Sequence, residues 1–93
     1  MSLLLKDPDA VLDYEIDWGA DYLDEDLLAS SRWEVTPDEP GGVVVVDDGF
    51  EPNRSNVSLA GGSVGHLYRI ANHVSTQSGR EDKRSLFLRV EAR

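Results

Sequence analysis

Hydrophobic and polar residues alternate strictly over residues 10–18, AVLDYEIDW. The even positions are apolar and are Leu12, Tyr14, Ile16 and Trp18. The odd positions between them are acidic and are Asp13, Glu15 and Asp17. A period of two is typical of a β-strand with one buried and one wet face, whereas on a helix the same apolar residues would spread around the axis. We therefore predict a strand whose carboxylates face solvent.

Two more alternating segments lie near the end of the chain. In residues 66–76, HLYRIANHVST, the inward side chains are Tyr68, Ile70, Asn72 and Val74. In residues 84–92, RSLFLRVEA, the inward side chains are Leu86, Leu88 and Val90. The polar stretch QSGRED between them, residues 77–82, predicts the loop of an antiparallel hairpin. The glycines at 61, 62 and 65 permit a sharp turn into this hairpin. Asn72 is either the sign of a bulge or a buried amide, which would need hydrogen-bond partners.

Three shorter patterns complete the predicted strands. LLASSRWEV at residues 27–35 is extended, with Trp33 and Val35 on one face, and the β-branched run VVVV at residues 43–46 is a short strand. NVSLAGG at residues 56–62 places Val57 and Leu59 on one face. Prolines and glycines in TPDEPGG (36–42) predict a break, and DDGFEPN (47–53) predicts another turn. Apart from a turn near residues 20–28, no segment has a helical pattern.

Six to eight short strands at intervals of roughly ten residues predict an all-β fold. We expect an Ig-like or fibronectin-III-like antiparallel β-sandwich without a disulfide, in one domain over residues 1–93. Residues 1–9 can form an extended N-terminal arm. Tyr68 near the start of the penultimate strand matches the tyrosine corner of such folds, and Trp18 or Trp33 is needed to fill the space between the sheets. An SH3-like or OB-like barrel is the alternative, but the long strands favour the sandwich.

The chain contains no cysteine. Disulfides, thiolate metal sites and a cysteine nucleophile are therefore excluded, and a reducing compartment is expected. No apolar run approaches the ~20 residues that span a bilayer, and the leucines of MSLLLKDPDA are too few for a secretory signal. Residues 1–3 can equally be a remnant of cloning.

The net charge of −9 disfavours nucleic acid and anionic membranes as partners. The charge is unevenly divided, because residues 1–53 carry fifteen acids and two bases while residues 54–93 carry seven bases and three acids. In one interpretation the two halves lie side by side and partly neutralise each other. In the other, opposite charges on different faces favour head-to-tail association.

None of the polar clusters matches a known catalytic or metal-binding pattern. A solvated strand face does not give Asp13, Glu15 and Asp17 the unequal environments of an acid/base pair. The acids at 24–26 and those at 47, 48 and 51 can attract calcium, but neither group has EF-hand spacing. His66 and His73 would lie on opposite faces of a strand and ~23 Å apart, so they cannot share a metal. We therefore predict no catalytic, cofactor-binding or metal-binding residue, and no cofactor.

The chain resembles a family of small tailed-phage and prophage virion proteins, which are described as fiber–tail adaptor or head–tail joining proteins. The resemblance lies in KDPDAVLDYEIDW, in the Trp of WEV and in LAGGSVGHLYRIANHVSTQSGREDKRSLFLRV. Its late positions are Gly61, Gly62, Gly65, Tyr68, Asn72, Thr76, Gly79, Arg80, Asp82, Arg84 and Ser85. Residues 37–56 carry no resemblance, and the acidic DEDLL departs from the Gly-Asp turn of the family.

This resemblance implies a non-enzymatic structural component of a phage or prophage particle, joining tail and fiber or head and tail parts through protein–protein contacts. It implies other virion proteins as partners, a place in the virion and assembly in the bacterial cytoplasm. A homo-oligomeric ring on the particle would suit the divided charge. The predicted interface residues are Arg69, Arg80, Arg84 and Arg89.

The alternative function is a stand-alone fibronectin-III-like module that recognises carbohydrate or protein. A contiguous exposed platform of aromatic side chains would favour it, and the residues to inspect are Trp18, Tyr22, Trp33 and Phe87. An enzyme would require a deep cleft with two convergent carboxylates.

Overall fold

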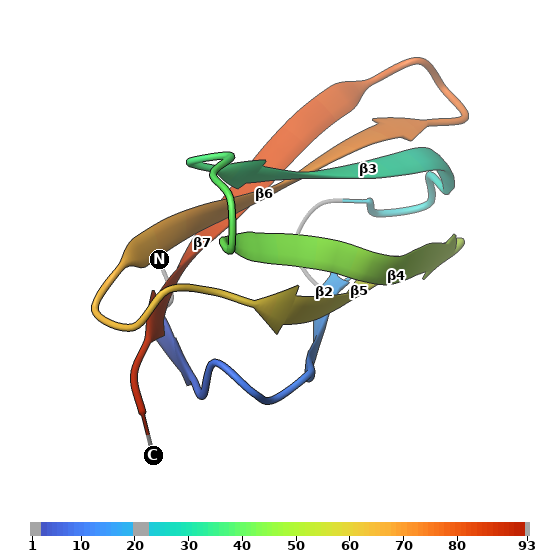
Figure 1. Ribbon diagram of the computed structural model, residues 1–93. Helices are drawn as coiled ribbons and strands as arrows, with labels where there is room; N and C mark the ends of the chain where they lie inside the picture. The colour runs from blue at the N-terminus through green and yellow to red at the C-terminus, as the bar shows by residue number, and fades with distance from the viewer. Residues whose placement is uncertain (1–2, 20–22, 93) are drawn as a thin grey trace.

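The computed structural model describes residues 3–19 and 23–92, and in these residues it contains seven strands and no helix. The strands form two layers, which face each other in Figure 1. Their bounds are β1 Leu3–Lys6, β2 Leu12–Asp17, β3 Leu28–Thr36, β4 Val43–Glu51, β5 Arg54–Gly61, β6 Leu67–Thr76 and β7 Glu81–Val90. The predicted all-β sandwich is confirmed.

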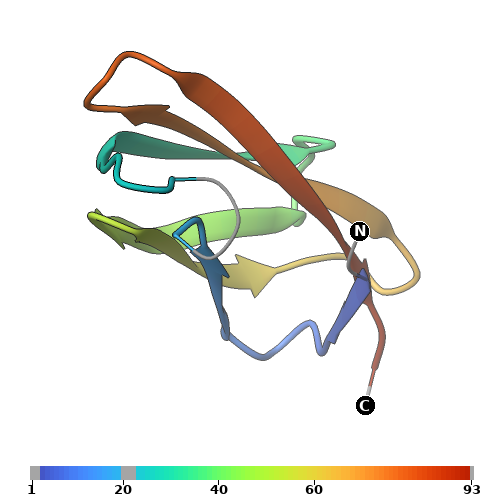
Figure 2. The same ribbon diagram turned by 180° about the vertical axis from the view of Figure 1, so that it is seen from behind.

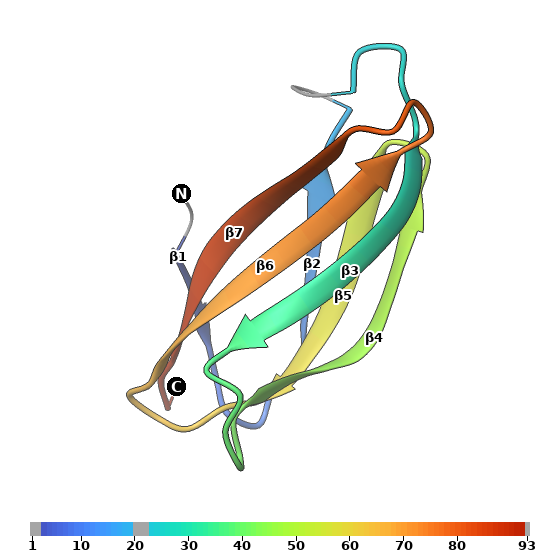
Figure 3. The same cartoon turned by 90° about the horizontal axis from the view of Figure 1, so that it is seen from above.

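One sheet has four strands in the order β1-β7-β6-β3, and the other has three in the order β2-β5-β4. Seen from above, β7, β6 and β3 lie side by side over β2, β5 and β4 (Figure 3). All pairs are antiparallel except β1 with β7, which is parallel. Figure 2 shows the start of the chain beside the end of β7. Part of the segment that the sequence suggests as an N-terminal arm is thus an edge strand.

The predicted inward residues meet in a buried layer between the sheets. One cluster contains Val57 and Leu59 of β5 and Tyr68, Ile70, Leu86, Leu88 and Val90 of the β6–β7 hairpin. A second cluster contains Ile16, Trp18, Leu23, Leu28 and Val74. Tyr14 and Trp33 pack against both clusters, so the core is continuous. Burying such side chains contributes about 1.5–3 kcal/mol each, and this layer holds the sheets together.

Tyr68 makes the predicted tyrosine corner. The side chain is fully buried, and its hydroxyl oxygen accepts a 3.0 Å hydrogen bond from the backbone N–H of Ser63. The hydroxyl in turn donates to Glu39 Oε1 at 2.6 Å, and that oxygen also lies 2.8 Å from His66 Nδ1. These hydrogen bonds, first that from Tyr68, lower the pKa of the Glu39 carboxyl. The corner therefore ties the β3–β4 loop to the β5–β6 loop.

Lys6 is a buried cation that the sequence pattern does not reveal. Its side chain is almost fully buried, and Nζ donates to the carbonyl oxygens of Gly61 at 2.7 Å and Asp7 at 2.8 Å. Burial lowers the pKa of this ammonium group. Since Lys6 ends β1 and Gly61 ends β5, the contact joins an edge strand of one sheet to a strand of the other.

Two predicted boundaries are wrong. Residues 47–51 are not a turn but the second half of β4, where Asp47 pairs with Ser58 and Glu51 with Arg54. The register shifts between Val45 and Asp47, so a bulge breaks the alternation that would have marked the strand. Similarly, β7 begins at Glu81 within the predicted loop, because the turn closes over residues 77–80. Cross-strand pairing overrides the turn-like composition of both segments.

The glycines before β6 are required by close packing as well as by their conformation. Gly62 has φ +110°, and a Cβ built on it would lie 2.5 Å from Val90 Cγ2. Gly61 has φ +76°, and its Cβ would lie 2.7 Å from the carbonyl oxygen of Gly42. Only glycine fits both conditions, so the predicted sharp turn is confirmed here.

Candidate interaction surfaces

The four arginines predicted as interface residues all lie on the β6–β7 hairpin, but in different settings. Arg69 on β6 and Arg89 on β7 are exposed on the outer face of the four-stranded sheet. Arg69 Nε donates to Ser85 Oγ at 3.2 Å, and Arg89 Nε lies 3.0 Å from Glu91 Oε1. These are weak surface contacts, so both guanidinium groups remain accessible to a partner.

Arg80 lies in the turn and holds another loop. Its Nε and Nη2 both donate to Asp26 Oδ2 at 3.2 Å, and Nη2 also donates to the carbonyl oxygen of Leu23. Asp26 further accepts from the Ser78 hydroxyl at 2.5 Å and from the N–H of Leu27. These hydrogen bonds, led by that from Ser78, lower the pKa of the Asp26 carboxyl strongly. Arg80 therefore has a structural role in joining the β6–β7 turn to residues 23–27.

Arg84 lies on β7, on the inward side of the sheet. Its guanidinium carbon lies 4.5 Å from the ring centroid of the buried Trp18. Such stacking of a cation on an indole is favourable when it is partly desolvated. Arg84 thus lies over the core beside β2, where it lines a hollow with Tyr14 and Ile16.

An apolar patch surrounds Arg69 and Arg89, and we call it the Leu/Arg patch. It comprises Leu3, Leu5, Leu67, Arg69, Phe87 and Arg89. The register places Leu3 and Arg69 beside Phe87, and Leu5 and Leu67 beside Arg89. The leucines are 61%, 45% and 53% exposed, respectively. Exposed leucines interleaved with arginines have the composition of an interaction surface.

The opposite outer face, on the three-stranded sheet, is acidic, and we call it the acidic face. Its acids are Asp13, Glu15 and Asp17 on β2 and Asp47 and Glu51 on β4. Arg54 is the only base on this face of the described strands, and it pairs with Glu51 at 3.2 Å and Glu15 at 3.6 Å. The prediction that the carboxylates of β2 face solvent is confirmed.

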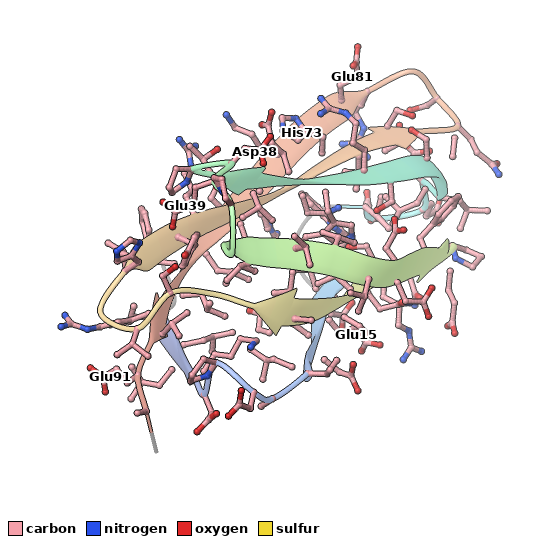
Figure 4. The ribbon with its side chains drawn as sticks, viewed as in Figure 1. Glu15, Asp38, Glu39, His73, Glu81 and Glu91 are labelled. Atoms are coloured by element: carbon pink, nitrogen blue, oxygen red, sulfur yellow. The ribbon has the colours of Figure 1, made fainter. Side chains whose placement is uncertain are left out.

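A shallow groove of about 650 Å³ lies at the other end of the four-stranded sheet from the Leu/Arg patch. Arg32, His73 and Lys83 line it together with serine hydroxyls. His73 Nε2 lies 3.4 Å from Glu34 Oε1, and Figure 4 shows His73 on the side of the sandwich opposite to Glu15. His66 lies at the far end of β6, beside Glu39. The two histidines thus lie near different carboxylates.

The described part of the chain can be compared with the requirements of metal sites, membrane spans and a platform of aromatic side chains. No group of three or more His, Asp or Glu side chains in it could hold a metal ion, and none of its segments is a helix able to span a bilayer. Trp18 is buried and Trp33 half-buried in the core, so only Phe87 of the described aromatic candidates lies on an outer face. Tyr22 lies outside the described residues.

Sequence reasoning missed the leucines of the Leu/Arg patch. Leu67 has the parity of Arg69 along β6, and that signal could have placed it outward. Leu3 and Leu5 gave no such signal, since only the parallel pairing with β7 shows which face they share with Phe87 and Arg89. The burial of Arg84 against Trp18 also depends on a contact between the two sheets.

Comparisons with known proteins agree with this architecture. The solution structure of the PKD domain from KIAA 1837 protein is 20% identical, with a TM-score of 0.55, over 98% of this chain and 79% of that one. This likeness supports an Ig-like β-sandwich and shows the fold alone. No curated protein matches the chain. A family model described as podophage GP4 fiber-tail adaptor protein gp77 matches residues 6–89. The chain therefore belongs to the podophage GP4 fiber-tail adaptor protein gp77 family.

Proposed function

We propose that this protein is a non-enzymatic structural component of a phage or prophage particle, which joins tail and fiber or head and tail parts through protein–protein contacts. The observation that carries this proposal is the family match over residues 6–89, which includes β2 to β6 whole, β7 except its last residue, and the last residue of β1. A fiber-tail adaptor family suggests a structural adaptor role, binding to other virion proteins and a place in the virion. Assembly of the particle takes place in the host cytoplasm.

The physical properties of the domain support this role. An adaptor between two assemblies must keep its fold when force acts on it. In this domain, buried hydrogen bonds as well as apolar packing connect the two sheets. The scaffold presents two broad sheet faces with different chemistry. Arginine and aromatic side chains, which the Leu/Arg patch supplies as Arg69, Arg89 and Phe87, are enriched in the contact regions of protein complexes.

Of the four predicted arginines, we assign the intermolecular contacts to Arg69 and Arg89. Replacement of Arg80 or Arg84 would disturb the Asp26 contact or the Trp18 stack, so a loss of assembly in such variants would not identify an interface. Arg69 and Arg89 make only exposed contacts on the outer face, and their replacement by glutamate reverses charge without opening the core.

The function is tested by deleting the gene from the phage or prophage and supplying the wild-type chain or the Arg69→Glu, Arg89→Glu double variant in trans. Particles are purified and their protein content is measured by mass spectrometry. We expect the wild-type chain in the particles, and particles without fibers or with incomplete tails when it is absent. Complete, fibered and infectious particles from the deletion strain would rule out the proposed role. A folded double variant incorporated at the wild-type level would remove Arg69 and Arg89 from the interface while leaving the role itself intact.

A further inference from the structure

The outer faces of the two sheets carry charge of opposite sign. The strands of the four-stranded sheet present Arg32, Arg69, Lys83 and Arg89 outward, against Glu34 and Glu81. Glu91, just after β7, pairs with Arg89, so the bases outnumber the acids by four to three. We call this surface the basic face, and it contains the Leu/Arg patch at one end and the groove beside His73 at the other. The acidic face presents five acids and Arg54. Figure 4 shows Glu81 and Glu15 on opposite sides of the molecule.

The acids of the acidic face are arranged in rows across the sheet. Asp13 on β2 and Asp47 on β4 both pair with Ser58 of the central strand β5, so they flank one row. Asp17 and Glu51 likewise flank Arg54 in another row. Because one base faces five carboxylates, the face retains an excess of negative charge that a cationic surface would compensate.

Both faces also expose apolar side chains. Leu3, Leu5 and Leu67 lie on the basic face. Val44 on β4 is 52% exposed and lies beside Ala60 on the outer face of the three-stranded sheet, and Val46 at the bulge is 56% exposed. Contact between the two faces would therefore bury apolar surface as well as pair charges, which is the usual composition of a specific interface.

We propose that the partner of the basic face is the acidic face of a second copy of this chain. Arg69 and Arg89 of one copy would meet the row of Asp13 and Asp47 of the next. The backbone has principal extents of 42, 21 and 18 Å, and a standard interface buries about 800 Å² per partner, so the contact uses most of a sheet face. The proposal goes beyond the virion role and does not depend on it.

The position of the faces decides the kind of assembly. Since they lie on opposite sides of the sandwich, two copies in contact leave one basic and one acidic face free. The contact is heterologous, so it propagates from copy to copy and closes only if the rotation between neighbours completes a ring. An isologous contact would instead place like charges opposite each other, which is unfavourable.

The net charge of −9 opposes association at long range. At about 0.15 M salt the Debye length is roughly 8 Å, so this general repulsion is screened while charges in direct contact still interact. We therefore expect self-association to be strongest near this ionic strength. It should weaken at about 1 M salt, where pairs at the interface are screened as well.

The experiment uses sedimentation equilibrium of the whole chain and two variants. The basic-face variant carries Arg69→Glu and Arg89→Glu, and the acidic-face variant carries Asp13→Lys and Asp47→Lys. A control with Glu25→Lys and Asp38→Lys makes the same change in net charge as the acidic-face variant, but in exposed loops. Circular dichroism verifies that each variant is folded.

We expect the wild type and the control to associate with increasing concentration, and each face variant alone to be monomeric. Mixed in equal amounts, the two face variants should associate again, because one intact face of each sign remains and the two charge-reversed faces also carry opposite charges. A monomeric wild type up to about 1 mM, face variants that associate like the wild type, or a mixture that stays monomeric would each overturn the proposal. Since none of these results involves particles, they leave the proposed function to its own test.

Discussion

Trp18 and Asn72 connect the two sheets directly, since the indole Nε1 of Trp18 donates a 2.9 Å hydrogen bond to Asn72 Oδ1. Trp18 follows β2 of the three-stranded sheet and Asn72 lies on β6 of the other. Ser55 on β5 donates to the same oxygen at 2.5 Å. Asn72 Nδ2 donates to Ser31 Oγ and to the carbonyl oxygen of Arg32. The inward amide is thus satisfied, as its place in the sequence pattern required.

Replacement of Asn72 by alanine should lower the free energy of unfolding by about 2–4 kcal/mol. It removes the acceptor of the buried Ser55 hydroxyl, leaves Trp18 Nε1 with only its 3.2 Å bond to Ser55 Oγ, and creates a small cavity. The control is Asn56→Ala, at an exposed position of β5, which should change stability by no more than about 0.5 kcal/mol. Urea unfolding at pH 7 measures both. Equal stability of the two variants would show that the buried hydrogen bonds of Asn72 contribute nothing to the free energy of unfolding.

Asp26 should make stability depend on pH. Its pKa is lower in the folded chain than in the unfolded one, chiefly through the hydrogen bond from Ser78. The stability that Asp26 contributes is therefore present above the pKa of this carboxyl in the unfolded chain, roughly 3.9. It is lost as the pH falls below that value toward the pKa in the folded chain. The variant Asp26→Asn should lose less stability than the wild type between pH 7 and pH 3.

The matched control for this measurement is Asp24→Asn, an exposed neighbour at φ +56°, where asparagine is tolerated. Urea unfolding curves for the three proteins at both pH values give the comparison. If Asp26→Asn and the wild type lose the same stability on acidification, the loop contact is not the source of the acid sensitivity.

Tyr68→Phe should destabilise the chain by about 1 kcal/mol, since the backbone N–H of Ser63 loses its acceptor. The pKa of Glu39 should rise toward its ordinary value at the same time, because the largest cause of its depression is removed. NMR titration of the Glu39 carboxyl carbon measures the pKa. Tyr14→Phe, which changes a half-buried tyrosine on β2, is the control and should leave that titration unchanged.

Gly62→Ala should be strongly destabilising, by about 2 kcal/mol or more, since a Cβ would overlap Val90 at a positive φ. Gly49 offers the comparison, because a Cβ there would meet only the side-chain amide of Asn56, at an ordinary 3.5 Å from Oδ1 and 3.8 Å from Nδ2, and φ is not positive. Thermal unfolding of Gly49→Ala should give a melting temperature close to that of the wild type. A similar melting temperature for Gly62→Ala would mean that β5 and β6 can adjust around the turn.

The parts of the fold that the sequence predicted are those that follow from patterns within one strand. Alternation placed Trp18 and Tyr68 inward, and glycine chemistry placed the turn at Gly61 and Gly62. The second half of β4 was missed because the bulge after Val45 interrupts the alternation and Asp-Asp-Gly resembles a turn. The strand at Leu3–Lys6 was missed because its pairing partner lies at the other end of the chain.

The candidate surfaces required contacts between strands. Charge counting divided the chain into acidic and basic halves, but only the register brings Asp13 and Asp47 to either side of Ser58. Register likewise separates Arg69 and Arg89, which face outward, from Arg84, which packs on Trp18. The sequence shows how many arginines the hairpin carries. It does not show which of them stabilise the fold and which are exposed on the outer face.

The most direct test of the structural role is a cryo-microscopy reconstruction of purified particles. The account predicts density for this seven-stranded sandwich at the junction of tail and fibers, or of head and tail, in several symmetry-related copies. A reconstruction in which that junction is complete, with every density assigned to other proteins and none to this chain, would contradict it.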